Sequence, residues 1–305
     1  MNDFTFNFIS PVTGKHLNLQ HQTYVTPDGD ESYPIIDTIP ILVRDVDDHL
    51  EMIHNLQESN RRSWYIDDQV TAYGKGAYRH HIKRRKKVIQ ARLSNIIKAY
   101  DHNDVIRMID LGCGDGASSR WLLECAPKTG YILFTDYNFD RINRARQLLT
   151  DPNGPFCSFV LSDITRPVLP PESCDLVFSN HVIEHVPDDF AVFKTAASIL
   201  KNGGYFVLGC PNEGVFFWML AYALNPNSIR NSDHVHFYNA ETLKDTGERA
   251  GLRCKEIIHI GYGIPDWRLD AMVRQFRFFD DLFHVVGSRL FKSQASSLYL
   301  IFQKL

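Results

Sequence analysis

The stretch 105-VIRMIDLGCGDGASS-119 decides how this 305-residue chain is predicted to fold. Positions 105–109 are mostly apolar and contain no proline or glycine, which predicts a strand buried on both faces. Gly112, Gly114 and Gly116 follow at alternate positions, where they allow positive φ angles and a close approach of a ligand to the backbone. A helix is predicted to begin at Ala117, so that the N–H groups of its first turn face the same crevice.

The spacing of these glycines points away from a nicotinamide dinucleotide. The dinucleotide fingerprint is G-x-G-x-x-G, whereas this turn is G-x-G-x-G and follows Asp110. A second predicted strand, 131–135, ends in Asp136, which lies about twenty positions after Gly116, the spacing expected for a carboxylate that binds ribose hydroxyls. The sequence therefore predicts an adenosine-binding site.

This block resembles motif I of the class I S-adenosylmethionine (SAM) methyltransferases, which implies SAM as the cofactor. In that family the acidic residue before the glycines and the acid that ends the second strand are both typical. The resemblance also implies that Asp163 accepts a hydrogen bond from the adenine amino group and that Ile164 packs on the ring. The expected cofactor-binding residues are Asp110, Gly112, Gly114, Gly116, Asp136, Tyr137, Asp163, Ile164 and Asn180.

Composition sets broad bounds on the protein. Hydrophobic residues make up 44% of the chain, enough to bury a sizeable core. The formal net charge is −3, so no global field attracts nucleic acid or anionic lipid. The cysteines are scattered without a C-x-x-C pair, which predicts buried free thiols in a reducing compartment. They are Cys113, Cys125, Cys157, Cys174, Cys210 and Cys254.

No membrane or export signal is evident in the sequence. The N-terminus has no basic segment followed by an apolar one, and the longest apolar run, 214–224, is far shorter than the ~20 residues a spanning helix needs. We therefore expect a soluble, cytoplasmic protein without a transmembrane segment.

Residues 1–48 are predicted to form a small β-rich module, because short alternating segments are separated by proline and glycine turns. The segments SPVTGKHL (10–17) and YPIIDTIPILV (33–43) resemble the zinc-ribbon-like domain of small activator partners of tRNA- and ribosome-modifying methyltransferases. Metal-binding members of that family have cysteines where this chain has Ser10 and Thr13. No cysteine precedes Cys113, so we expect no structural zinc here.

Residues 49–104 are predicted to be a linker and N-terminal helices that cap the cofactor site. The basic run 79–87 continues into apolar residues spaced by three and four positions, which is typical of an amphipathic helix. Its charges form either a solvated face or a site for an anionic substrate or RNA phosphate. The resemblance implies that Tyr73, Tyr78 or Arg79 contacts the methionine carboxylate of SAM.

Residues 105–305 show the alternation of strands and helices that predicts a mostly parallel α/β sheet. We expect a Rossmann-like fold with seven strands, and the resemblance implies that the last strand is antiparallel. Two insertions, 214–236 and 261–297, are rich in aromatic residues and represent either ordinary packing or a lid over an acceptor with an apolar part. Beyond 105–109, strands are expected at 131–135, 156–161, 174–179, 205–210, 253–260 and 298–304, helices at 140–149, 188–201 and 241–250, and a turn at 202–204.

The segment SNHVIEHVPD (179–188) resembles the E-H-V-x-D segment of many small-molecule methyltransferases, including the ubiquinone-type O-methyltransferases. On a helix, His181, Glu184 and His185 would share one face, where two imidazoles and a carboxylate suit zinc. In ubiquinone-type enzymes, however, the metal site is built on E-x-x-E-H, and His181 replaces the first Glu. We therefore predict no metal, with these residues as the set that could bind one.

A histidine is the expected general base. Methyl transfer from a sulfonium is an in-line displacement, in which a hydroxyl acceptor benefits from losing its proton to a group that titrates near neutrality. The candidates are His185 and the pair His234 and His236, whose segment DHVHFY (233–238) resembles a stretch after the fifth strand of similar O-methyltransferases.

These observations lead to a SAM-dependent methyltransferase that acts on a small molecule, most readily at oxygen, with an apolar, lipid-like or glycosyl part. An RNA methyltransferase is the first alternative, favoured by the N-terminal module and the basic run but opposed by the acidic balance. A non-catalytic SAM-binding scaffold is the second, and a dehydrogenase is a distant third. The assembly state, including a homodimer, stays open.

Overall fold

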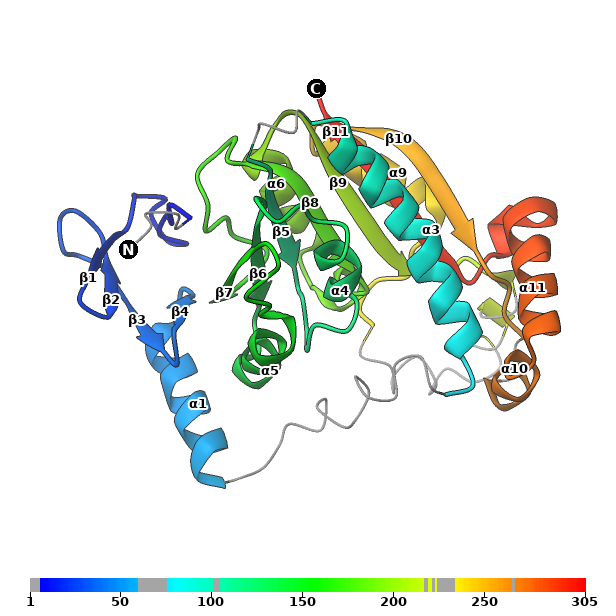
Figure 1. Cartoon of the computed structure of the whole chain (residues 1–305), viewed down its shortest axis with the longest axis horizontal. Coiled ribbons are helices and arrows are strands. Elements are labelled where there is room, and N and C mark those ends of the chain that lie inside the picture. The colour runs from blue at the N-terminus through cyan, green and yellow to red at the C-terminus, as the bar shows by residue number, and fades with distance from the viewer. Residues whose placement is uncertain are drawn as a thin grey trace.

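One mixed sheet of eleven strands runs through the described part of the chain in the computed structural model (Figure 1). The structure describes residues 6–59, 76–100, 105–216, 219–220, 223, 234–264 and 267–305. The strand order is β1-β2-β3-β4-β7-β6-β5-β8-β9-β11-β10. The strands are β1 (Asn18–Gln20), β2 (Thr23–Val25), β3 (Ser32–Ile36), β4 (Ile39–Leu42), β5 (Arg107–Leu111), β6 (Tyr131–Asp136), β7 (Phe156–Ser162), β8 (Cys174–Asn180), β9 (Leu200–Pro211), β10 (Leu252–Ile260) and β11 (Ser297–Lys304).

Seven of these strands form the predicted Rossmann-like core. Strands β7, β6, β5, β8 and β9 are parallel to one another, and β11 lies antiparallel between β9 and β10. The predicted number of seven is wrong for the whole sheet, because β4 pairs parallel with β7 and adds the four N-terminal strands. This pairing covers the backbone of β7, which would otherwise be an exposed edge. The predicted N-terminal β-rich region is confirmed, whereas its likeness to a zinc ribbon stays a prediction.

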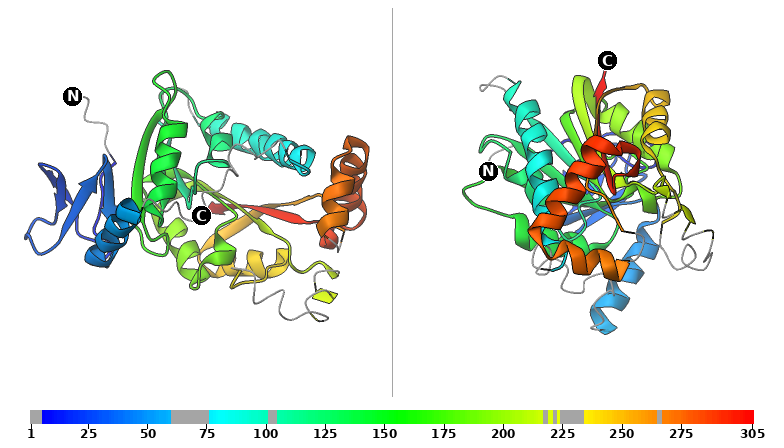
Figure 2. Two further views of the ribbon diagram at one scale, coloured as in Figure 1. Left: turned by 90° about the horizontal axis from the view of Figure 1, so that it is seen from below. Right: turned by 90° about the vertical axis from the view of Figure 1, so that its right-hand side faces the viewer.

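Helices cover both faces of the sheet, so that β5 is buried on both sides as predicted. Met108 of β5 packs in the core formed with α3, α4 and α5, whereas its neighbour Ile109 packs in the core formed with α6 and α9. Figure 2 shows α3 and α9 on opposite sides of the sheet. The helices are α1 (Val46–Ser59), α3 (Arg79–Lys98), α4 (Ser119–Leu123), α5 (Phe139–Leu149), α6 (Asp189–Ile199), α9 (Ala240–Arg249), α10 (Trp267–Arg274) and α11 (Arg277–Val285), with short turns at Ile183–His185, Val286–Leu290 and Lys292–Gln294.

The predicted turn at 202–204 is wrong, because β9 already begins at Leu200 and runs through these residues. The partner of β8 changes from Leu200 opposite Cys174 to Tyr205 opposite Leu176, so the extra residues form a bulge inside the strand. Gly203 supplies the positive φ (+83°) that the bulge requires. For the same reason the preceding helix ends at Ile199 rather than at residue 201.

Two further expectations concern the whole chain. The six cysteines are all free thiols, as predicted, but the predicted burial holds only for Cys113, Cys174 and Cys210. Among the described residues, no helix combines the length and the apolar character that crossing a bilayer requires. The predicted division at residues 48 and 104 stays a prediction. Tyr73, Phe217 and Trp218 lie outside the described residues.

Candidate functional site

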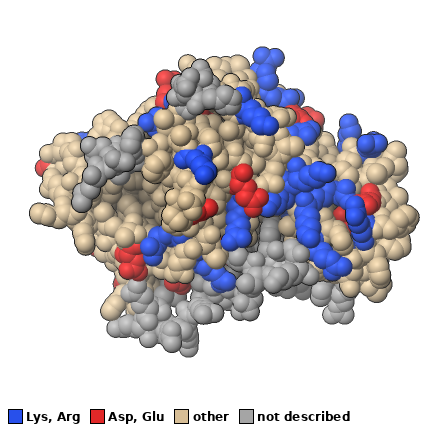
Figure 3. Space-filling view, viewed as in Figure 1, with Lys and Arg blue, Asp and Glu red and all other residues tan. Residues whose placement is uncertain are grey.

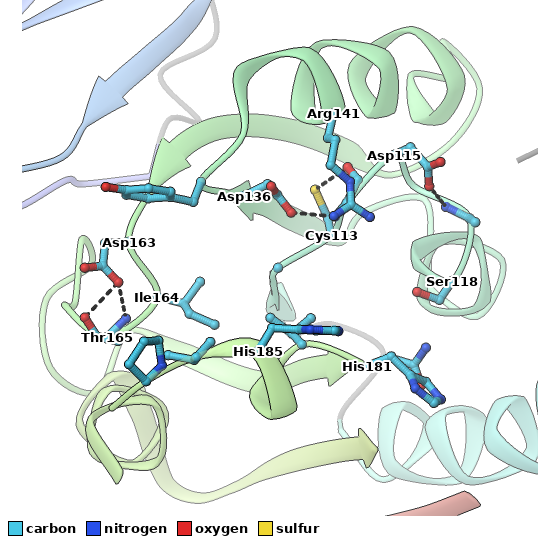
Figure 4. Close-up of a pocket in the computed structure, with 18 of the residues that line it drawn as sticks. Cys113, Asp115, Ser118, Asp136, Arg141, Asp163, Ile164, Thr165, His181 and His185 are labelled. Carbon is cyan, nitrogen blue, oxygen red and sulfur yellow. Dashed lines mark hydrogen bonds between the residues drawn. The ribbon is translucent and has the colours of Figure 1, made fainter. Parts of the chain in front are cut away.

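A cavity of about 890 Å³ opens where β5, β6, β7 and β8 end (Figure 4). This is the edge at which an open parallel sheet binds its ligands. Asp136 and Arg141 lie on one side of the cavity, and His181 and His185 lie across from them. Of the expected cofactor-binding residues, the structure brings seven to the cavity wall: Gly112, Gly114, Asp136, Tyr137, Asp163, Ile164 and Asn180.

The glycine turn forms the floor of this cavity. Gly112, Gly114 and Gly116 have φ values of +79°, +56° and +89°. The N–H groups of Gly112 and Cys113 both donate to the carbonyl of Thr135 in β6, at 2.9 and 2.8 Å. A Cβ atom on Gly112 would lie only 2.5 Å from Cγ1 of Val182, in the loop that follows β8. The turn therefore requires glycine both for its backbone conformation and for the close approach of this loop.

Asp136 links the turn to the second strand. Its Oδ2 accepts a hydrogen bond from the N–H of Gly114 at 2.8 Å, and its Oδ1 accepts one from the N–H of Asn138 at 2.9 Å. Burial raises the pKa of this carboxyl, while the charge of Arg141 and the two N–H donors oppose the rise. Each carboxylate oxygen has a second lone pair, so the group can hold the turn and still accept from ribose hydroxyls.

Asp163 and Ile164 occupy the wall that the end of β7 forms. The Oδ1 atom of Asp163 accepts from both the N–H and the hydroxyl of Thr165, at 2.9 and 2.7 Å, which fixes the loop. The side chain of Ile164 is buried against the core. A carboxylate beside an apolar side chain is the arrangement that the adenine interpretation requires.

Asp110 does not line the cavity but supports the turn from within β5. Its carboxyl is buried, and burial raises its pKa to about 7; a hydrogen bond from Ser119 opposes this rise and the charge of Asp136 adds to it. Gly116 also lies outside the cavity wall, where a Cβ atom would lie 3.0 Å from Leu149. These two predicted residues therefore act on the shape of the turn.

Asp110→Asn is expected to flatten the pH dependence of stability. Because folding raises the pKa of Asp110 from 3.8 to about 7, its contribution to stability is present below about pH 4 and is lost as the pH rises through 7. Asparagine cannot ionise, so above pH 7 the free energy of unfolding of the variant should exceed that of the wild type by up to ~4 kcal/mol. Urea unfolding at pH 5 and pH 8 measures this, with the exposed Asp30→Asn as control; equal pH slopes in wild type and Asp110→Asn would contradict the assignment.

Arg85 is a cavity residue that the sequence interpretation missed. It lies on α3, is buried, and donates to the hydroxyl of Tyr299 at 2.7 Å and to Oδ1 of Asn180 at 3.4 Å. Its guanidinium also lies over the ring of Trp121, 5.7 Å from the centroid. The four-residue steps of the buried positions on this helix could have identified it: His81, Arg85, Ile89 and Leu93.

Tyr78 and Arg79, two of the residues expected at the methionine carboxylate, do not line the cavity. The ring of Tyr78 packs under the guanidinium of Arg274, at 5.8 Å. Arg79 donates to the carbonyl of Gln275 at 3.2 Å. Both therefore hold the start of α3 against the segment 261–297. The residue of α3 that lines the cavity is instead Arg85.

His181, Glu184 and His185 come together although the predicted helix is only a short 3₁₀ turn. The Oε1 atom of Glu184 lies 3.2 Å from Nδ1 of His181 and 3.9 Å from Nε2 of His185. Burial alone would raise the pKa of Glu184, but the hydrogen bond and the charge of His181 outweigh it and lower the pKa. Burial and the charge of Arg85 lower the pKa of His181, against the opposing effect of Glu184. A buried carboxylate therefore stands next to two imidazoles.

The second histidine segment docks on the first. The N–H of Val235 donates to the carbonyl of Glu184 at 2.8 Å. His234 hydrogen-bonds through Nδ1 to the buried carboxylate of Glu213, and its ring meets the ring of His185 edge to face at 4.9 Å. His236 instead donates through Nε2 to the carbonyl of Pro187, at 3.1 Å. The structure thus joins His234, but not His236, to the cavity residue His185.

A three-residue group with metal-ligand geometry appears among the described residues. Ligand atoms of Glu184, His185 and His234 all lie within 4.8 Å of one another. This group differs from the predicted one, since His234 takes the place of His181. Two imidazoles and one carboxylate suit zinc. The absence of a metal stays a prediction.

Comparisons with known proteins identify this chain as similar to methyltransferases. A family model described as a methyltransferase domain matches residues 78–257. The chain is similar to a trans-aconitate 2-methyltransferase of Enterobacter sp. (strain 638), with 31% identity over 36% of this chain and 41% of that protein. It is also 26% identical to a ubiquinone biosynthesis O-methyltransferase of Hydrogenovibrio crunogenus, over 61% of this chain and 75% of that protein. The chain spans about two fifths of the length of the trans-aconitate methyltransferases that it matches.

Solved structures share the fold. A structure from Galdieria sulphuraria assigned as a sarcosine dimethylglycine methyltransferase superposes with a TM-score of 0.51 at 15% identity, over 73% of this chain and 86% of that one. The CurJ carbon methyltransferase gives a TM-score of 0.50 at 14% identity, over 72% of this chain and 53% of that one. At these identities the likeness shows the α/β fold alone.

Proposed function

Because this chain belongs to the methyltransferase domain family, with S-adenosylmethionine as its cofactor, we propose that it transfers a methyl group to an oxygen atom of a small-molecule acceptor. The predictions of a methyltransferase and of this cofactor are confirmed at the level of the family. The observation that carries the finer proposal is that one cavity holds both the glycine turn and His185 beside the buried Glu184.

The residues of the cavity fit S-adenosylmethionine. At Gly112 and Gly114 the turn presents backbone without a side chain to the cavity. A Cβ atom at these positions would lie 2.5 Å from Cγ1 of Val182 and 2.7 Å from Nη2 of Arg141. Asp136 suits the ribose hydroxyls, Asp163 and Ile164 suit the adenine, and the cation of Arg85 suits the methionine carboxylate. When bound, the donor supplies a methyl group on a positively charged sulfur, which is open to in-line attack.

His185 is the proposed general base. It lines the cavity, and its imidazole takes the proton of the acceptor hydroxyl as the oxygen forms its new bond to carbon. The Glu184 carboxylate, 3.9 Å from Nε2, stabilises the imidazolium that results. His234, held by Glu213, packs against the ring of His185 and fixes its orientation. His234 is therefore a positioning residue.

Arg85→Met is expected to weaken binding of S-adenosylhomocysteine about tenfold or more, because the variant loses a charge-assisted contact to the carboxylate. Binding of 5′-methylthioadenosine, which lacks the amino-acid part, should change less than threefold, which is ~0.6 kcal/mol. Calorimetric titration of both ligands measures the difference. Equal losses for the two ligands would show that Arg85 only supports the shape of the cavity.

Several features support an acceptor with an apolar part. Segments 214–216 and 234–237 flank the histidines and expose Phe216, Val235 and Phe237. Similarity to a ubiquinone biosynthesis O-methyltransferase favours oxygen as the methylated atom. The cytoplasmic location is part of this proposal, whereas the identity of the acceptor and the assembly state, including a homodimer, stay open.

The alternative of an RNA acceptor draws on the basic run of α3, but much of that charge is engaged within the protein. Arg85 points into the cavity, Lys86 pairs with Glu124 at 2.7 Å, and Arg92 pairs with Glu256 at 2.8 Å. What is left for phosphate groups is a short exposed row. This arrangement favours the small-molecule acceptor.

The proposal is tested by incubating the full chain with SAM labelled in its methyl group and a panel of acceptors: phenols with apolar tails, carboxylic acids, glycosides, amines and tRNA. We expect label in a compound with an oxygen nucleophile. Label in tRNA alone, or tight cofactor binding with no turnover on any class, would contradict the proposal and favour the RNA enzyme or the scaffold.

A further inference from the structure

Helix α11 buries a carboxylate and exposes a row of apolar side chains. Asp280 is buried at 1% exposure, whereas Phe278 is 71% exposed. Leu282 and Val285 are exposed as well, and their spacing of four and three residues places them on the same face as Phe278. A helix that packs only on its own protein has the opposite arrangement.

Buried ion pairs fix this orientation. The guanidinium of Arg274 donates to Asp270 at 2.8 Å and to Asp280 at 3.1 Å, and Arg84 of α3 donates to Asp280 at 3.2 Å. Turning α11 to bury Phe278 would separate Asp280 from both arginines and remove one of the two carboxylates that pair with the buried Arg274, which is unfavourable. These ion pairs therefore keep the apolar face of α11 turned toward solvent.

The rings of Phe276 and Phe278 each contact the ring of Phe279, with centroids 6.4 and 5.5 Å apart. We call these side chains and the other large exposed apolar side chains of residues 272–291 the apolar patch. Its members come from residues 272–291, and each is between 40% and 71% exposed. Patches of this kind on a protein surface mark contact with another molecule or with a membrane. The apolar patch consists of Met272, Phe276, Phe278, Phe279, Leu282, Val285, Leu290 and Phe291.

Exposed lysines and arginines lie on α3 and on the segment that carries the apolar patch. Within residues 267–292 the acidic side chains are engaged by arginines: Asp270 and Asp280 are buried against Arg274, and Asp281 pairs with Arg84 and Arg277. Figure 3 shows lysines and arginines gathered over the part of the surface where α3 and α11 lie. The exposed basic residues of this region are Lys83, Lys87, Arg277, Arg289 and Lys292.

We propose that the apolar patch docks on the surface of an anionic lipid bilayer. Apolar side chains ringed by lysine and arginine are what an interfacial helix presents to acyl chains and to anionic headgroups. With nine residues, α11 is too short to span a bilayer and would lie in its plane. The net charge of −3 does not predict attraction to anionic lipid. The exposed lysines and arginines near the patch supply that attraction locally.

Sedimentation of the full chain with vesicles tests this proposal. We expect binding to vesicles of phosphatidylcholine mixed with phosphatidylglycerol, weaker binding to phosphatidylcholine alone, and a loss of binding as salt is raised. Phe278→Ser with Leu282→Ser should lower the partition coefficient about tenfold or more. Both positions are exposed, so the variant should keep its affinity for S-adenosylhomocysteine, which reports an intact fold.

Leu19→Ser is the matched control, because Leu19 is an equally exposed leucine (55%) on β1, away from the apolar patch. It should bind vesicles like the wild type. The proposal is overturned if the wild type does not bind anionic vesicles, or if the double variant and Leu19→Ser have the same partition coefficient. It is also overturned if analytical ultracentrifugation shows that the double variant dissociates a dimer of the wild type, since a second copy would then cover the patch. None of these three outcomes depends on methyl transfer, so this test is separate from the proposed function.

Discussion

Replacing His185 by alanine is expected to lower kcat at least about 100-fold while leaving the affinity for S-adenosylhomocysteine within about threefold. The reason is that the His185 imidazole lines the cavity, with the buried Glu184 carboxylate 3.9 Å from its Nε2, whereas burial and the charge of Arg85 lower the pKa of the second cavity imidazole, His181. Without His185, the acceptor hydroxyl must lose its proton to water. Steady-state kinetics and calorimetry of the same preparation measure the two quantities.

His236→Ala is the matched control for this prediction. His236 stands two residues from His234, but its Nε2 donates to the carbonyl of Pro187 and it does not line the cavity. Its kcat should stay within about threefold of the wild type. If His185→Ala lost turnover and cofactor affinity equally, the assigned role as general base would be wrong. If kcat fell more in His236→Ala than in His185→Ala, the general base would lie in the second histidine segment.

Gly112→Ala is expected to weaken binding of S-adenosylhomocysteine about 100-fold. The new Cβ would lie 2.5 Å from Cγ1 of Val182, on a residue whose φ is +79°. The left-handed conformation alone costs ~1–2 kcal/mol, and relief of the clash must move the turn or the loop that carries His181 and His185. Either movement distorts the wall of the cavity. Calorimetric titration measures the loss, and a thermal melt records how much of it is a change in stability.

Gly251→Ala separates strain from the clash. Gly251 also has a positive φ, +90°, but a Cβ atom there would meet nothing within 4 Å. This variant should lose some stability and bind the cofactor normally. Normal binding by Gly112→Ala would show that the turn does not form part of the cofactor site.

The sequence predicted those parts of the fold that local patterns determine. The buried strand before Gly112 and the alternation of strands and helices mark a sheet covered on both faces, and glycines at alternate positions mark a turn with positive φ. Asp136 is predicted at the site from its position at a strand end, because the ends of parallel strands meet at one edge, whereas Asp163 is predicted from the family resemblance; both line the cavity.

Features that depend on distant partners were not predictable in the same way. The pairing of β4 with β7 joins residues 41 and 161, and the bulge in β9 depends on its register with β8. Arg85 stands in a run of basic residues that looks solvated, and only its four-residue spacing from Ile89 shows that it faces inward. The grouping of His234 with Glu184 and His185 depends on how a later segment docks on the turn after β8.

The central claim is that the glycine turn at the end of β5 holds the adenosyl part of a methyl donor. Calorimetric titration of the wild type with S-adenosylhomocysteine tests it most directly, with NADH as the competing ligand. The account predicts one site per chain for S-adenosylhomocysteine, abolished or strongly weakened by Gly112→Ala, and no binding of NADH. Tight binding of NADH, or no heat with S-adenosylhomocysteine, would contradict it.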